Sequence, residues 1–324
     1  MKKYYPDYYK NFRCLAGACT DTCCASWEIC IDDDTLEYYR SVKGEFGKRL
    51  NDSITSDPYG DAIFRLNGKR CPFLNKDNLC DIHIDLGEAH TCEVCREHPR
   101  FTEIYDGFTE ISLSASCPAA NDIIFNAPLS WDTYPFPEYG GNDGLLSALL
   151  SERNKLFSLI SGSESLTELA LHLRQSAVEV SEWFYDYNDS YDRFYSFSAE
   201  VLCGFESFLL NESEILTDEW RQTLYSVYRK ELPDEVFYKF CSDNVEKIKK
   251  AFAYFVYRYF LKAVNDESPE LNSAFIALCV FVCVDISAKT NTDFSQCVRI
   301  FSKETEHDTE NIELIKAYIE DKGR

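Results

Sequence analysis

The sequence predicts a mainly α-helical protein, in which an irregular, cysteine-rich N-terminal region is followed by an all-α helical domain. The chain has 324 residues and 15 cysteines, of which ten lie between Cys14 and Cys117. In that part of the chain, turn-forming pairs such as Asn67-Gly68 interrupt regular patterns of apolar residues. From residue 145 onward, apolar residues recur at helical spacing. With 45% hydrophobic and 15% aromatic residues, the chain has enough material for a folded core.

The chain is expected to divide into a cysteine-rich metal-binding region (residues 1–125), a linker (126–144) and the helical domain (145–324). In the first region, apolar patterns predict two helices and two short strands, at about 34–49, 83–96, 62–66 and 108–113. The linker is indicated by closely spaced helix breakers: Pro128, Pro135, Pro137, Gly140, Gly141 and Gly144. Because the first region holds little regular structure, it needs another source of order, which metal ligation can provide.

Helices account for most of the third part. They are predicted at about 145–160, 165–185, 192–210, 214–231, 234–264, 270–288 and 308–321. Ser165 and Glu168 form a capping-box pattern at the start of the second of these helices. Cys279 and Cys283 share one face of an apolar helix, so we expect them to be core thiols rather than metal ligands.

The balance of charge bears on the partners of the protein. The chain carries a formal net charge of −22 at pH 7, and this argues against DNA or RNA binding, which requires basic surface. The longest apolar run, 274–284, has 11 residues and is shorter than the roughly 20 of a spanning helix, so no membrane segment is expected. No apolar segment follows the first lysines, which predicts a cytoplasmic protein without a secretory signal. In a reducing compartment, cysteines serve more often as metal ligands or buried thiols than as disulfides.

The ten N-terminal cysteines fall into four groups. The first group is Cys14-x4-Cys19-x-Asp21-x-Cys23-Cys24-x2-Trp27-x-Ile29-Cys30, the second is Cys71-Pro72-Phe73-Leu74-x5-Cys80, the third is Cys92-x2-Cys95 and the fourth is Cys117 followed by Pro118. Thiolates favour zinc, copper(I) and iron–sulfur clusters, so this density of cysteines predicts a metal site. The spacing leaves the metal open, because four thiolates close a zinc site and three or four hold a [4Fe–4S] cluster.

In this order, the residues of the four groups resemble the bacterial flagellin lysine N-methylases (FliB), within the YkgJ-type cysteine-cluster family. The matching positions are Phe12, Cys14, Cys19, Asp21, Cys23, Cys24, Trp27, Ile29, Cys71, Pro72, Phe73, Leu74, Leu79, Cys80, Ile82, Leu86, Gly87, Cys95, Arg96, Pro99, Arg100, Ser116, Cys117, Pro118 and Ala120. The resemblance covers residues 12–120, and the helical remainder carries no motif that we can align with the family.

The resemblance implies a protein-lysine N-methyltransferase that moves methyl groups from S-adenosylmethionine to the ε-amine of lysines in flagellin, its protein substrate. It also implies a metal centre, for which an iron–sulfur cluster of the [4Fe–4S] type is the expectation and zinc the alternative. The metal ligands that it implies are Cys14, Cys19, Cys23, Cys24, Cys71, Cys80, Cys95 and Cys117. Cys30 and Cys92 stand outside the pattern. The alternative function is a non-catalytic zinc- or iron–sulfur-binding module with a structural or electron-transfer role.

The chemistry of lysine methylation requires a neutral amine aligned with the sulfonium methyl group, and a group that accepts the amine proton. Asp21, Asp32, Tyr105 and Asp106 are candidates for that acceptor. No glycine-rich loop of the Rossmann type follows a predicted strand, so the sequence assigns no site for S-adenosylmethionine.

Overall fold

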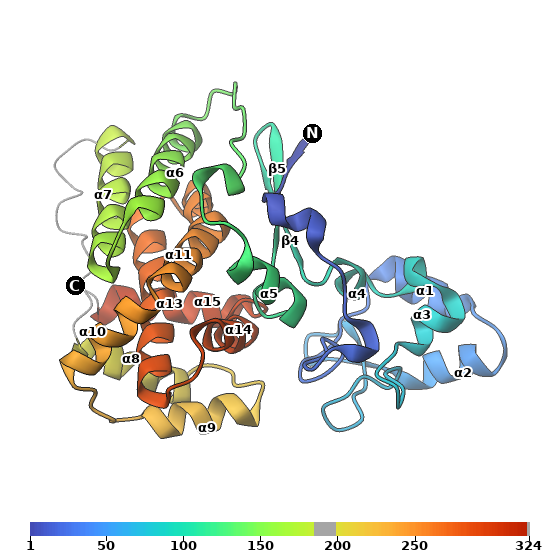
Figure 1. Cartoon of the computed structure of the whole chain (residues 1–324). Coiled ribbons are helices and arrows are strands. Elements are labelled where there is room, and N and C mark those ends of the chain that lie inside the picture. The colour runs from blue at the N-terminus through green and yellow to red at the C-terminus, as the bar shows by residue number, and fades with distance from the viewer. Residues whose placement is uncertain (185–198, 323–324) are drawn as a thin grey trace. The chain divides into compact units, whose positions relative to one another are not determined.

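The computed structural model describes residues 1–184 and 199–322 (Figure 1). Helices dominate the structure, which confirms the predicted mainly α fold. The chain divides into two compact units. We call the first, Met1–Phe12 with Thr102–Ser116 and Ala120–Arg324, the helical unit, and the second, Arg13–Phe101 with Cys117–Ala119, the cysteine unit.

This division differs from the expected boundary at residue 125, because residues 102–116 belong to the helical unit. Strand β5 (Phe108–Leu113) pairs in parallel with β1 (Lys2–Tyr4) and lies between β1 and β4 (Arg100–Tyr105) in a three-stranded sheet. Side chains on both faces of β5 are buried, as in strands that are covered by other elements on both sides. The strand predicted at 108–113 therefore forms, but it is part of the core of the helical unit.

The segment 126–144, which was expected to be a linker, is part of the helical unit and packs against its helices. Tyr134 follows the 3-10 helix η4 (Trp131–Thr133) and is buried, with its ring stacked on Phe157 at a centroid distance of 4.6 Å. The Thr133 hydroxyl donates to the Pro128 carbonyl at 2.7 Å. These contacts make the segment a fixed connection inside one unit.

The cysteine unit is built from short elements. They are the 3-10 helix η2 (Ala16–Ala18), α1 (Asp33–Ser41), α2 (Gly44–Ser53), β2 (Ile54–Ser56), β3 (Ala62–Phe64), α3 (Asp81–Leu86), the 3-10 helix η3 (Glu88–His90) and α4 (Glu93–Glu97). Each of the two helices predicted here is broken in the structure. Gly44, at φ 81°, starts α2 after α1 has ended, and Gly87, at φ 90°, ends α3. The strand predicted at 62–66 is β3, which pairs with β2 in antiparallel fashion.

The helical unit contains the longer helices (Figure 1). They are α5 (Pro118–Asn126), α6 (Gly144–Gly162), α7 (Leu166–Phe184), α8 (Ala199–Asn211), α9 (Asp218–Val227), α10 (Asp234–Asp243), α11 (Val245–Tyr259), the 3-10 helix η5 (Phe260–Lys262), α12 (Ala263–Asp266), α13 (Pro269–Thr290), α14 (Phe294–Thr305) and α15 (Thr309–Lys322). The predicted helix 234–264 is divided at Asn244, and the sequence reading missed α14. Residues 192–198 of another predicted helix lie outside the described residues.

Helix α13 lies at the centre of the helical unit and packs against α7, α11, α14 and α15, as Figure 1 shows. Its length and composition would allow it to cross a membrane, but most of it is buried within the protein. Cys279 and Cys283 are fully buried on this helix, which confirms that they are core thiols. In α11, the aromatic side chains from Tyr254 to Tyr259 are buried in the same core.

A buried ion pair joins the sheet to the helices of this unit. The Arg153 guanidinium of α6 donates to the Glu110 carboxylate of β5 through two bonds, at 2.7 and 2.5 Å. The side chains are 0% and 3% exposed. Such an ion pair fixes the position of both partners, since either charge alone would be costly to bury.

Replacing Glu110 with Gln keeps the shape of the side chain but leaves the Arg153 charge without its counter-charge. We expect the free energy of unfolding to fall by about 3–5 kcal/mol, measured by urea denaturation. The control is Asp243→Asn, which removes an exposed ion pair with Lys239 and should cost less than about 0.5 kcal/mol. Equal losses in the two variants would contradict this account of the ion pair.

Candidate metal centre

All ten N-terminal cysteines lie in the cysteine unit. Cys117 belongs to this unit through the short segment Cys117–Ala119, although residues on both sides of that segment are in the helical unit. Each of these cysteines is a free thiol. The fold thus collects the eight expected ligands, together with Cys30 and Cys92, in one compact body of the chain.

The first cysteine loop is anchored to the second cysteine group by its backbone. The Cys71 N–H donates to the Cys24 carbonyl at 2.9 Å, and the Ser26 N–H donates to the Lys69 carbonyl at 2.8 Å. Gly17 passes so close to the turn of the second group that a Cβ there would lie 2.7 Å from the Asp77 carbonyl oxygen. Only glycine permits this approach, so the first loop is held against the second cysteine group at two places.

The second cysteine group forms a hairpin, as the turn-forming residues 75–78 between its two cysteines predict. Leu74 and Cys80 form an antiparallel bridge, and the Asp81 N–H donates to the Phe73 carbonyl at 2.8 Å. The Asn75 side chain closes the turn by accepting the N–H groups of Asp77 and Leu79. This geometry places Cys71 and Cys80 at the base of one hairpin.

Four thiols meet the hydrophobic core of the cysteine unit. Cys71 and Cys92 are members of the core, with 7% and 1% exposure, and Cys24 and Cys80 pack against it. Tyr39, which is fully buried, places its hydroxyl 3.7 Å from the Cys92 sulfur. Cys95 is exposed but follows Cys92 after one turn of α4, and we call these four thiols together with Cys95 the inner thiols.

In two pairs of neighbouring thiols, each sulfur shifts the pKa of the other in the opposite direction. A hydrogen bond from Cys23 lowers the pKa of Cys24 to about 7, and the same bond raises the pKa of Cys23. A hydrogen bond from Cys95 likewise lowers the pKa of Cys92. Burial, by contrast, raises the pKa of Cys71 to about 12. Because the thiolate is the form that binds metals, the two pairs each offer one ready ligand.

The remaining expected ligands are not among the residues that pack against this core. Cys14 is exposed, and Cys19, Cys23 and Cys117 are half-buried. The hydrogen bond with Cys24 and burial raise the pKa of Cys23 most, and the charges of Cys14 and Cys117 add to this rise. We call these four the outer thiols.

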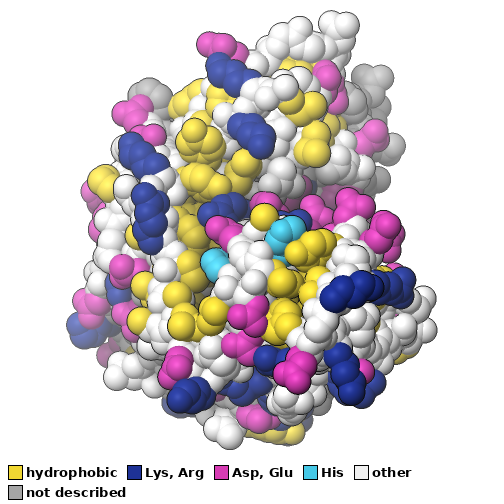
Figure 2. All heavy atoms as spheres, turned by 90° about the vertical axis from the view of Figure 1, so that its right-hand side faces the viewer, with side chains coloured by type: hydrophobic (Ala, Val, Ile, Leu, Met, Phe, Trp, Pro, Cys, Tyr) yellow, Lys and Arg dark blue, Asp and Glu magenta, His cyan; other side chains and the backbone are white. Residues whose placement is uncertain are grey.

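Figure 2 shows the side of the molecule that lies on the right in Figure 1. Hydrophobic side chains, a class that includes cysteine in this figure, gather there beside histidines and are surrounded by charged residues.

The arrangement of these side chains does not form a closed metal site. Among the residues that the structure describes, no group of three or more cysteine, histidine or acidic side chains is placed to hold a metal ion. The chemistry of the donors fits zinc or iron–sulfur, since the unit offers many thiols and no disulfide. Two nearby histidines have other roles: His90 stacks on Tyr38, and His98 packs against Trp27.

The sequence reading placed Cys92 outside the ligand pattern, yet the structure puts it among the inner thiols. It is the least exposed of the N-terminal cysteines that reach the core, and it begins helix α4 directly before Glu93. The Cys92-x2-Cys95 spacing is typical of a zinc knuckle or a redox pair and already pointed to Cys92, but the family pattern, which only Cys95 fits, led away from it.

The candidate proton acceptors are now placed. Asp21 lies in the first cysteine loop, where its backbone carbonyl accepts the Cys19 thiol at 3.3 Å. Asp32 is occupied by two backbone donors, the N–H groups of Thr35 and Glu93, at 3.0 and 2.8 Å. Tyr105 and Asp106 belong to the helical unit, where burial raises the pKa of Tyr105 and Asp106 accepts the Tyr139 hydroxyl at 3.0 Å. The geometry therefore singles out none of them as a base.

Comparison with known proteins finds relatives with flagellar and lysine-methylating names. A flagellar biosynthetic protein, FliU, of Salmonella muenchen is 29% identical over 129 residues, which are 38% of this chain and 76% of the relative. Lysine N-methylases of Salmonella choleraesuis and Salmonella typhimurium are each 27% identical over 195 residues, which are 57% of this chain. The match spans about half the length of these two enzymes (49%).

No family model matches the chain, and no solved structure matches it. The matched stretch of 195 residues is longer than the cysteine unit, so the relationship to the two enzymes reaches beyond the cysteine groups. The chain is therefore a distant relative of the lysine N-methylases.

The lowered pKa of Cys24 predicts that this thiol reacts faster than an ordinary cysteine. At pH 7, a pKa of about 7 leaves about half of Cys24 as thiolate, against a few per cent for an ordinary thiol. In metal-free protein, iodoacetamide should therefore alkylate Cys24 with a midpoint near pH 7, as followed by peptide mass spectrometry. Cys241, whose pKa burial raises to about 11, is the control.

The variant Cys23→Ala removes the hydrogen bond and should move the midpoint for Cys24 toward pH 9. A midpoint for Cys24 that is already near pH 9 in the unchanged protein would show that Cys23 does not lower the pKa of Cys24.

Proposed function

We propose that this protein is a methyltransferase that transfers methyl groups from S-adenosylmethionine to the ε-amine of lysines in flagellin. The observation that carries the proposal is the relationship to two lysine N-methylases over 195 residues, together with the flagellar relative that matches over 129 residues. The order of cysteine groups that resembles the flagellin lysine N-methylases lies in one compact unit, which supports the same assignment.

The reaction is a single displacement. The lone pair of the neutral lysine amine attacks the methyl carbon, the bond between this carbon and the sulfonium sulfur breaks, and S-adenosylhomocysteine leaves. The amine then gives its proton to a basic group or to water. The protein must hold the amine and the methyl group in line, and it must keep the amine unprotonated at the moment of attack.

We further propose that the cysteine unit binds a metal through its thiols, with an iron–sulfur cluster as the expected group and zinc as the alternative. Cys24, Cys71, Cys80 and Cys95 would supply inner ligands, and Cys14, Cys19, Cys23 and Cys117 would supply outer ligands. The elements of this unit are short, so bound metal would add order to it. The cytoplasm, where thiols stay reduced, is the compartment that suits this chemistry.

Activity can be tested by expressing the full chain together with flagellin in a bacterium whose flagellin lysines are unmodified. Mass spectrometry of the purified flagellin should then find methylated lysines. The variant Cys71→Ser should reduce this methylation at least tenfold if the inner thiols bind the metal, whereas Cys241→Ser, in the helical unit, should not. Flagellin without methylated lysines in cells that contain soluble, full-length protein would overturn the proposed activity.

Metal content can be tested separately. Protein purified without oxygen should contain iron with matching sulfide, or zinc, measured by elemental analysis. The variants Cys24→Ser and Cys80→Ser should each lose at least half of the metal, and Cys241→Ser should keep it. If the unchanged protein contains neither metal, the thiols have another role, and a measured methyltransferase activity would then proceed without a metal.

A further inference from the structure

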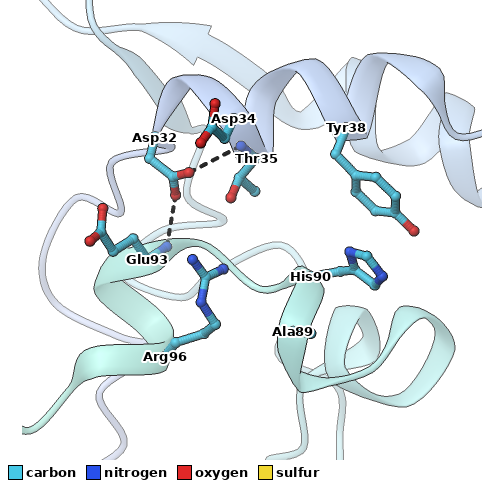
Figure 3. A pocket seen from close by; sticks show the side chains of 8 residues that line it. All are labelled: Asp32, Asp34, Thr35, Tyr38, Ala89, His90, Glu93 and Arg96. Carbon is cyan, nitrogen blue, oxygen red and sulfur yellow. Dashed lines mark hydrogen bonds between the residues drawn. The ribbon is translucent and has the colours of Figure 1, made fainter.

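A pocket of about 310 Å³ opens within the cysteine unit, on the side of α4 (Figure 3). Its volume lies at the lower end of the range found for small-molecule sites. The lining residues are Asp32, Asp34, Thr35, Tyr38, Ala89, His90, Glu93 and Arg96. They come from α1 on one side and from η3 and α4 on the other, as Figure 3 shows.

The two walls of the pocket are tied together. The Asp32 carboxylate accepts the N–H of Thr35 at the start of α1 and the N–H of Glu93 at the start of α4. Beneath them, the Tyr39 hydroxyl donates to the His90 carbonyl at 2.8 Å. The two walls of the pocket are therefore held together by part-buried and charge-assisted hydrogen bonds.

The charges that line the pocket are mixed in sign. Arg96 extends between the two walls in Figure 3, with one nitrogen donating to the Thr91 carbonyl. Among the residues that the structure describes, no side-chain partner is found for the carboxylates of Asp34 and Glu93, and both residues are exposed. Three carboxylates and one guanidinium give the lining a negative balance.

This combination of three carboxylates and one guanidinium fits a ligand that carries negative and positive groups and has a net positive charge. A guanidinium binds a carboxylate through its two parallel N–H groups, and the acidic side chains attract an ammonium group and a further cation. Across the two walls, the Tyr38 ring of α1 stacks on the His90 ring of η3 at 4.0 Å and an angle of 7°, and this pair provides a flat aromatic surface for a planar ring.

We propose that this pocket binds S-adenosylmethionine, and this inference rests on the function proposed above. The α-carboxylate of the ligand would pair with Arg96, and its ammonium and sulfonium groups would lie toward Asp34 and Glu93. The adenine would lie against the Tyr38 and His90 rings. Each part of the ligand thus has a partner of matching chemistry.

A lysine side chain of the protein substrate fits the pocket less well. The Arg96 guanidinium repels an ammonium group, and a lysine residue inside a chain brings no carboxylate to offset this. Its four methylene groups require apolar walls, whereas Ala89 is the one aliphatic side chain in the lining.

The pocket also lies next to the inner thiols. Glu93 and Arg96 belong to the same helix as Cys95, and Cys92 comes directly before that helix. Tyr39 links the two features, because its hydroxyl donates to His90 behind the pocket and lies 3.7 Å from the Cys92 sulfur. Binding in the pocket would therefore bring the methyl donor to the thiol-rich part of the unit.

The test is equilibrium binding of S-adenosylmethionine to the purified full-length protein, measured by calorimetry. Arg96→Gln should weaken binding about tenfold or more, since a charge-assisted carboxylate contact is lost. Asp34→Asn and Glu93→Gln should each weaken it several-fold. Arg40→Gln and Asp85→Asn, which change exposed charges of the same unit outside the pocket, are matched controls and should bind as the unchanged protein does.

A second ligand and a further variant separate the contribution of the acidic side chains from that of Arg96. S-adenosylhomocysteine lacks the positive sulfur, so its affinity should depend less on the two acidic side chains than that of S-adenosylmethionine. Arg96→Lys keeps the charge but loses the paired donors, and it should bind more tightly than Arg96→Gln. Circular dichroism of each variant verifies that the unit remains folded.

The outcomes distinguish this proposal from the proposed function. If S-adenosylmethionine binds the unchanged protein and all folded pocket variants equally, the pocket is not its site, and the methyltransferase assignment stands. If the pocket variants instead lose binding of a lysine-containing flagellin peptide while they keep S-adenosylmethionine, the pocket serves the substrate and the proposal is overturned. If the unchanged, metal-containing protein binds no S-adenosylmethionine, both the pocket assignment and the proposed methyl donor fail.

Discussion

The backbone hydrogen bond from Cys71 to Cys24 is the contact on which the arrangement of thiols depends. It joins the first cysteine loop to the second cysteine group, which lies almost 50 residues later in the sequence. Because Cys23 and Cys24 are adjacent in the chain, fixing Cys24 at the core leaves Cys23 on the side of Cys14 and Cys117. This bond holds Cys24 beside the core, whereas Cys23 is not among the residues that pack against the core.

This arrangement explains why a unit with short helices can be well defined. Its core includes large side chains, among them Tyr39, Phe64 and Phe73, and four of the five inner thiols belong to that core or pack against it. Small units of this kind often draw stability from metals. The helical unit needs no such help, since α13 alone is buried along most of its length.

Much of the architecture could be predicted from the sequence, and the failures have physical causes. The long helices were recognised because apolar residues recur at helical spacing in segments such as α6 and α13. The boundary at residue 125 differed from the structure because the pairing of β5 with β1 joins residues more than 100 positions apart. No local pattern reports such pairing. The breaks at Gly44 and Gly87 could have been read from glycine's tolerance of positive φ.

The candidate site, too, could be predicted from the sequence only in part. Its cysteines were visible as groups in the sequence, and the hairpin of Cys71 and Cys80 follows from the turn between them. The pocket could not be read from the sequence, because it forms where α1 meets η3 and α4, and it depends on Asp32 bonding across 61 positions to Glu93. The two features together define a unit that offers thiols for a metal and a charged pocket for a methyl donor.

The measurement that tests the central claim most directly is methyl transfer in a purified system. The full-length protein, prepared without oxygen and with its metal intact, would be incubated with unmodified flagellin and S-adenosylmethionine that carries a trideuterated methyl group. The account predicts that mass spectrometry will find trideuteromethyl groups on flagellin lysines, in amounts that rise with time and with the concentration of the protein. Unlabelled lysines after prolonged incubation with protein that is folded and metal-loaded would contradict it.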